Sequence, residues 1–159
     1  MAEVSITRCR DHSGVWIPPP LLYAAMFLLS ILLDSLFPLP LVPEGAGMVG
    51  PGLIVAGVVL SCWGAATLRA RGTSIVPIRP TTRLVTDGPY RFSRNPMYLG
   101  LLSIFMGVAL VKQLLWAVVL VPALLLMITV LVARKEEAYL AQKFGAEYRR
   151  YRTTVRRWL

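Results

Sequence analysis

The sequence predicts an all-α, polytopic membrane protein with about four transmembrane helices and a C-terminal cytoplasmic amphipathic helix. Hydrophobic residues make up 56% of the 159 residues, and the mean hydropathy is +0.62. The apolar residues lie in long blocks, which suit a bilayer span better than a soluble core. With four spans, all but one of the 17 lysines and arginines would lie on one side. We therefore expect one membrane-embedded domain over residues 1–159.

The first two spans are expected at residues 21–37 and 51–70, after a cytoplasmic tail at residues 1–20. Pro51 suits the first position of a helix, where no amide donor is needed. Residues 45–50 match the G-x-G-x-x-G string of dinucleotide-binding folds, but no strand precedes them. We interpret them as a flexible loop on the outer side of the membrane.

The third and fourth spans are expected at residues 96–111 and 114–133. Only Lys112 and Gln113 separate them, which predicts a helical hairpin with a tight turn. The sixteen residues of the third span fall short of a bilayer that twenty residues cross at ~1.5 Å per residue. We expect residues 134–159 to form the cytoplasmic amphipathic helix.

The charge distribution predicts the orientation and limits the partners. Both termini and residues 69–95 should face the cytoplasm, and the short loops favour a bacterial inner membrane. The net charge of +9 by itself could indicate nucleic acid, but the long apolar blocks argue against that partner. His12 is the only histidine and there are two cysteines, Cys9 and Cys62, so no metal site is expected.

The start of the third span carries a candidate anion site. Asn95 and Pro96 read as an N-cap and the first helical residue, so unpaired amides and the positive end of the helix dipole would face the cytoplasm. Arg94 adds positive charge, and Gly100 leaves room for a ligand beside the first turn. A basic loop held by anionic lipid is an equally good interpretation of these residues.

The segment after residue 133 carries an acidic pair and an apolar stripe. Glu136 and Glu137 follow the fourth span and could face the start of the third. The stripe has helical spacing and favours an amphipathic helix lying on the membrane; it consists of Leu140, Phe144, Tyr148, Tyr151 and Val155.

Together these motifs resemble the isoprenylcysteine carboxyl methyltransferase and phospholipid methyltransferase superfamily over roughly residues 50–155. The resemblance rests on the strings at residues 84–90 (LVTDGPY), 94–100 (RNPMYLG), 136–137 (EE) and 144–151 (FGAEYRRY). It implies an integral-membrane enzyme that uses S-adenosylmethionine without a Rossmann-type fold. The cofactor pocket would lie at the cytoplasmic ends of the last membrane helices, capped by the C-terminal segment, and a lipophilic substrate would enter from the bilayer.

Carried over by position, the resemblance implies a set of cofactor-binding residues and leaves the catalytic residues open. Arg94 and Arg134 are the candidates for positioning the substrate. The implied cofactor-binding residues are Thr82, Arg83, Leu84, Val85, Gly88, Tyr90, Asn95, Pro96, Met97, Tyr98, Gly100, Glu136, Glu137, Tyr148 and Tyr151.

Two departures from the superfamily pattern bear on the substrate. Many members have histidine where this chain has Asn95, and asparagine cannot shuttle a proton. Eukaryotic members carry an arginine for the substrate carboxylate where this chain has Val132. The expected function is a carboxyl O-methyltransferase for a lipophilic or lipid-modified substrate. The alternatives are an N-methyltransferase of a phospholipid or other amine lipid, and a non-enzymatic membrane scaffold or lipid-binding protein.

Overall fold

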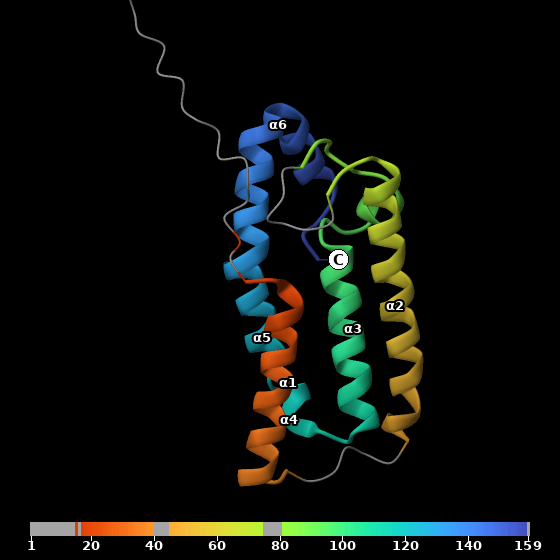
Figure 1. Ribbon diagram of the computed structural model, residues 1–159, viewed down its shortest axis with the longest axis vertical. Coiled ribbons are helices and arrows are strands. Elements are labelled where there is room, and N and C mark those ends of the chain that lie inside the picture. Colours follow the sequence, from red (N-terminus) through yellow and green to blue (C-terminus); the bar gives the residue numbers. More distant parts are fainter. Residues whose placement is uncertain (1–14, 16, 40–44, 75–80, 159) are drawn as a thin grey trace, which may run out of the picture.

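All the regular elements of the described chain are helices in this computed structural model, which describes residues 15, 17–39, 45–74 and 81–158. One side of the molecule is built from α1 (Pro19–Leu36), α4 (Leu115–Val119), α5 (Val121–Ile128) and α6 (Arg134–Thr154), and the other from α2 (Ala46–Ala70) and α3 (Pro96–Val111) (Figure 1). The end of α2, the 3-10 helix η1 (Gly88–Arg91), the start of α3 and α6 gather at one end. Cys9, His12 and Trp16 lie outside the described residues.

Two helices, α1 and α2, are long and apolar enough to cross a membrane, and α3 is a shorter apolar helix. The bounds of α3 are those that the sequence predicts, residues 96–111. The predicted turn is also present: Gln113 adopts a left-handed φ of 53°, and the amide of Leu114 donates to the carbonyl of Ala109 at 2.9 Å. This tight connection returns the chain beside α3.

The start of α2 differs from the prediction. Residues 46–50 are helical rather than a flexible loop, and Pro51 lies inside the helix rather than at its first position. Gly45 precedes the helix with a left-handed φ of 89°. The extra turn packs directly on α3, because a Cβ built on Gly50 would lie 2.7 Å from the carbonyl oxygen of Gly107. The G-x-G-x-x-G string therefore begins a helix and supplies a packing glycine.

Glycines allow α2 and α3 to approach closely. A Cβ on Gly57 would lie 2.5 Å from the carbonyl oxygen of Gly100, and one on Gly64 would lie 2.8 Å from Cγ of Met97. Close approach through small residues is a common way for membrane helices to pack. The space beside Gly100 is filled by Ser61 and Gly57 of α2, so the expectation that Gly100 leaves room for a ligand is wrong.

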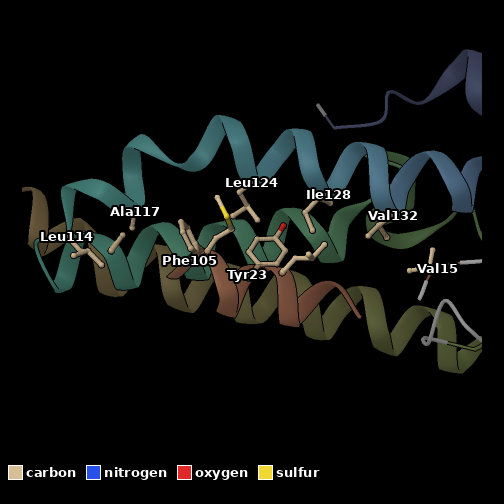
Figure 2. Close-up of a cluster of buried hydrophobic side chains, with 11 residues drawn as sticks. Val15, Tyr23, Phe105, Leu114, Ala117, Leu124, Ile128 and Val132 are labelled. Carbon is tan, nitrogen blue, oxygen red and sulfur yellow. The ribbon is translucent and has the colours of Figure 1, made fainter. Parts of the chain in front are cut away.

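The main apolar core lies between α3 and the side of the molecule formed by α1, α4 and α5 (Figure 2). Phe105 lies at its centre and makes edge-to-face contacts with Tyr23 and Phe27 at centroid distances of 6.2 and 5.8 Å. The hydroxyl of Tyr23 donates to the carbonyl of Tyr98 at 2.8 Å, which satisfies this phenol where it is buried. The core thereby fixes the start of α3 relative to α1.

The predicted fourth span at residues 114–133 is not one helix. It consists of α4, α5 and a π-helical segment, η2 (Thr129–Ala133). Pro122 lies in the first turn of α5, and its missing amide and its ring explain the break after α4. η2 then continues into α6 without interruption, so residue 134 marks no helix boundary.

The C-terminal helix turns back on itself. Gly145 has φ 50° and ψ −116°, and α6 bends there (Figure 1). Tyr148, Tyr151 and Val155 are buried and pack with Leu84 and the remaining stripe residues. The favoured interpretation of residues 134–159, a single helix with its stripe on the membrane, is therefore wrong, because the stripe covers the loop before α3.

Candidate functional site

A cavity of about 420 Å³ lies where α2, α3, α6 and the start of α1 converge. This volume is within the range of small-molecule and cofactor sites. Its wall is mostly apolar, with Leu68, Leu101 and Leu140 among the lining residues. Among the described residues, the charged side chains in the wall are those of Arg83, Arg94 and Glu136. The cavity is therefore an apolar hollow with a few polar groups.

Glu136 and Tyr98 close one side of the cavity. The Tyr98 hydroxyl donates to Oε1 of Glu136 at 2.6 Å, which joins the first turn of α3 to the first turn of α6. Burial raises the pKa of Glu136 to about 7, although the hydrogen bond from Tyr98 lowers it; the nearby charge of Glu137 raises it further. Glu136 therefore changes its charge near neutral pH, at the edge of a cavity.

Tyr90 lies beside the same acid in the cavity wall. Burial raises the pKa of Tyr90 above its usual range, and the charge of Glu136 adds to the shift. Its phenol is therefore uncharged at physiological pH. Tyr90 is held by η1, whose position is fixed when the Tyr151 hydroxyl donates to the carbonyl of Tyr90 at 2.6 Å.

Glu137 points to a different set of partners. Its Oε1 lies 3.3 Å from Nη1 of Arg94 and 2.6 Å from Nε of Arg157, and its Oε2 accepts from Nη2 of Arg157 at 2.9 Å. Only 11% of the Glu137 side chain and 9% of the Arg94 side chain are exposed. A buried carboxylate is thus shared by two guanidinium groups.

The start of α3 is bound to the C-terminal segment. The amide of Arg94 donates to the carbonyl of Arg156 at 3.0 Å, and Ser93 Oγ and Asn95 Nδ2 donate to the carbonyl of Arg157, each at 3.1 Å. Asn95 occupies the N-cap position, but its side chain makes no capping hydrogen bond. The prediction that Asn95 is the N-cap residue is confirmed, while its Nδ2 binds the C-terminal segment.

The loop before η1 forms another part of the wall. Val85 is buried, and Leu84 packs against the tyrosines of α6. The amide of Thr81 donates to the Tyr139 hydroxyl at 3.2 Å. Thr82 is tied to the end of α2 instead: its amide donates to Oγ1 of Thr73 at 3.1 Å and its hydroxyl to the carbonyl of Gly72 at 2.9 Å.

The structure brings most of the sequence-predicted residues to one cavity. Those that line it are Arg83, Leu84, Val85, Tyr90, Arg94, Asn95, Pro96, Met97, Tyr98, Glu136 and Tyr151. Those outside its wall are Thr82, Gly88, Gly100, Arg134, Glu137 and Tyr148.

The residues outside the cavity wall either make packing or polar contacts elsewhere in the structure or are exposed. Gly88 has a left-handed φ of 57°, and a Cβ there would lie 2.7 Å from Oγ1 of Thr67. The Tyr148 hydroxyl accepts from Nη1 of Arg94 at 3.3 Å. Arg134 is exposed on α6 and does not line the cavity, and its role in positioning the substrate stays a prediction.

Several lining or supporting residues are missed by sequence reasoning. Ser61 and Thr73 line the cavity as ordinary polar residues of α2 and its exit, with no motif around them. Pro18, Pro19 and Pro20 line it from the start of α1, where the proline run signals only a stiff helix entry. Arg157 is missed because its partner, Glu137, lies 20 residues earlier.

The polar groups fit a ligand with one anionic end. Nε of Arg94 is buried and has no hydrogen-bond partner among the described residues, although Arg94 lines the cavity. The N-terminus of α3 lies beside it and favours an anion. Glu136 on α6 and Tyr98 on α3 offer acceptors for hydroxyl or ammonium groups of a ligand. These groups suit the carboxylate, ribose and amino groups of S-adenosylmethionine.

Most of the chain matches a known protein family. Residues 46–147 match the family described as Phospholipid methyltransferase, which belongs to the same superfamily as the isoprenylcysteine carboxyl methyltransferases. An uncharacterized protein of Haemophilus influenzae (strain Rd) is 45% identical over 65 residues, which are 40% of this chain and 100% of that protein. No solved structure matches the chain.

Proposed function

Because the chain belongs to the phospholipid methyltransferase family, we propose that it is a membrane-embedded enzyme that methylates the amine headgroup of a lipid, with S-adenosylmethionine as methyl donor. The match runs from the start of α2 into α6 and includes the segment between α2 and α3, so it contains most of the residues that line the cavity. The family uses this donor, and its name implies a lipid substrate. The acceptor and the residues that hold each group are our inference.

The hydrogen bond between Tyr98 and Glu136 is the observation that carries this proposal. It joins two of the four sequence strings that resemble the superfamily, and the two bonded residues are 38 positions apart in the chain. Had these stretches been distant, the motifs could not serve one cofactor. Their contact at the edge of an apolar cavity supports a site where a polar cofactor meets a lipophilic acceptor.

We assign the cofactor groups to residues by charge. Arg94 Nε and the start of α3 would hold the carboxylate, since an arginine beside a helix N-terminus offers charge-assisted donors. Glu136 would accept from the ribose hydroxyls or the ammonium group, and Tyr90 would pack along the ligand. The sulfonium, when bound, supplies an already activated methyl group, so the chain itself must orient the acceptor and exclude water.

The family match and the charges around the cavity favour an amine as the methyl acceptor. The sequence alone favours a carboxyl acceptor, but the family match supports the amine-lipid alternative better. An amine attacks only as the neutral base, and an apolar cavity favours that form. Val132 is fully buried in the core, so the position where eukaryotic relatives carry an arginine offers no cation to a substrate carboxylate.

We place the protein in a membrane with the cavity on the cytoplasmic side. α1, α2, α3 and the α4–α5–η2 segment would be the four spans. The arginine-rich ends of α2 and α6 and the start of α3 lie at the same end of the molecule, as the positive-inside rule requires for four spans (Figure 1). A lipid could then reach the cavity from the inner leaflet.

Two assays test this function. Calorimetry of the purified protein with S-adenosylhomocysteine should show binding, which separates an enzyme from a non-enzymatic scaffold or lipid-binding protein. Membrane lipids incubated with the purified protein and S-adenosylmethionine carrying a labelled methyl group should then gain label that survives base hydrolysis. Label released as methanol would identify methyl esters and a carboxyl acceptor, and absence of both binding and transfer would overturn the proposal.

A further inference from the structure

We propose that Arg157 is a positioning residue: it holds Glu137 so that the Arg94 guanidinium keeps its Nε free for an anionic ligand group in the cavity. The proposal deepens the function proposed above and rests on it for the identity of the ligand. Arg157 is not part of the cavity wall, so its effect on the ligand would pass through Glu137 and Arg94.

The geometry of the three side chains supports this chain of contacts. Arg157 makes two hydrogen bonds with the Glu137 carboxylate, 2.6 Å to Oε1 and 2.9 Å to Oε2, which is a bidentate arrangement. Arg94 reaches only Oε1 of Glu137, through Nη1, at 3.3 Å. Arg157 therefore makes the stronger interaction with the Glu137 carboxylate, and Arg94 contacts only one of its oxygens.

The Nε atom of Arg94 explains why the sharing of the Glu137 carboxylate by two arginines matters for the ligand. Nε of Arg94 is buried and unpartnered among the described residues, and an unmade hydrogen bond of a buried charged donor is costly. Without Arg157, both oxygens of Glu137 would be available to Arg94. A bidentate pair through Nε and an Nη nitrogen would then satisfy Arg94 internally and leave this cavity-lining residue without its unpartnered donor.

Hydrogen bonds to the backbone of Arg156 and Arg157 fix the C-terminal segment against the start of α3. The carbonyls of Arg156 and Arg157 accept from the amide of Arg94 and from the side chains of Ser93 and Asn95. The C-terminal segment thus contacts the residues on both sides of the Arg94 side chain. Burial of Val155 and packing of Trp158 against the main core hold the segment in place.

Ligand binding by the full-length protein in detergent tests the proposal. The variants are Arg157→Ala, Arg157→Lys and the matched control Arg156→Ala, which removes the same charge from the neighbouring exposed arginine. The ligands are S-adenosylhomocysteine and its decarboxylated analogue, which lacks only the carboxylate. Thermal unfolding without ligand shows whether each variant is folded.

Arg157→Ala should weaken the affinity for S-adenosylhomocysteine about tenfold or more, because one charge-assisted interaction is lost. Its affinity for the decarboxylated analogue should stay within about twofold of the wild type. Arg157→Lys keeps the charge without the bidentate geometry and should show an intermediate loss. Arg156→Ala should bind both ligands like the wild type.

Other results would overturn the positioning role. Equal losses for both ligands, in a folded Arg157→Ala or in Arg157→Lys, would indicate a general structural role. An unchanged affinity for S-adenosylhomocysteine would show that Arg157 does not act on the site. If the wild type binds neither ligand, the proposed function itself fails, which is a distinct outcome.

Discussion

The hydroxyl of Tyr98 donates a hydrogen bond of 2.6 Å to Oε1 of Glu136 and thereby joins the starts of α3 and α6. Both side chains line the cavity. The next residue along α6, Glu137, faces the other way, toward Arg94 and Arg157. Two adjacent acids thus have separate partners, since successive residues of a helix point about 100° apart.

Glu136 should make the stability of the empty protein depend on pH. Its pKa is raised from 4.5 to about 7 in the folded protein. The folded state therefore holds this proton over a wider pH range than the unfolded state, and stability falls as the pH rises through that window. Glu136→Gln should unfold at a higher temperature than the wild type at pH 8 and at a similar temperature at pH 5.

The same carboxyl should control cofactor binding. The affinity of the wild type for S-adenosylhomocysteine should rise between pH 6 and 8, because only the carboxylate is a good acceptor for ribose hydroxyls or an ammonium. Calorimetry at several pH values measures this, with Glu136→Gln expected to bind more weakly and with a flatter profile. A profile that is identical in the variant and the wild type would exclude Glu136 from the ligand site.

Arg94 and Arg134 should respond differently to the same substitution. Arg94→Lys removes the Nε donor and the planar fork, so we expect S-adenosylhomocysteine to bind about tenfold more weakly or worse. Arg134→Lys changes an exposed side chain outside the cavity wall and should leave binding unchanged. A loss in Arg134→Lys as large as in Arg94→Lys would contradict the site as described.

Gly57 should be essential for the contact between α2 and α3. A Cβ there would lie 2.5 Å from the carbonyl oxygen of Gly100, and backbone cannot yield as a flexible side chain can. Gly57→Ala should lower the free energy of unfolding by about 1–3 kcal/mol through overpacking. The control is Gly52→Ala in the same helix, where nothing lies within 4 Å. It should be neutral or stabilising by about 0.5–1 kcal/mol.

Gly145 should be required for the bend in α6 and, through it, for the cavity. Its φ of 50° and ψ of −116° form a combination that glycine alone adopts readily. No atom lies within 4 Å of a Cβ built there, so the effect of Gly145→Ala is one of backbone strain, about 1–3 kcal/mol. Unfolding in detergent measures the stability, and weaker ligand binding should accompany it. A variant as stable as the wild type would show that the bend tolerates a side chain.

Local patterns in the sequence are sufficient to predict the helical class, the bounds of α3 and the turn at Gln113. They also pick out the motif strings, which contribute several of the residues that line the cavity. These features depend on hydrophobic run length, on proline and on turn geometry, which act over a few neighbouring residues. Pro122 is a local signal for the break before α5, but the prediction follows the length of the apolar block and treats residues 114–133 as one helix.

The tertiary structure decides which of the predicted residues face the cavity. Gly100 and Gly88 are taken up by contacts with α2, and Glu137 by an arginine that follows it by 20 residues. The stripe on α6 turns inward because Gly145 reverses the chain and Leu84 meets it. Such contacts depend on the rotation and register of packed helices, and the sequence alone fixes neither, since the spacing of residues within one helix says nothing about its neighbour.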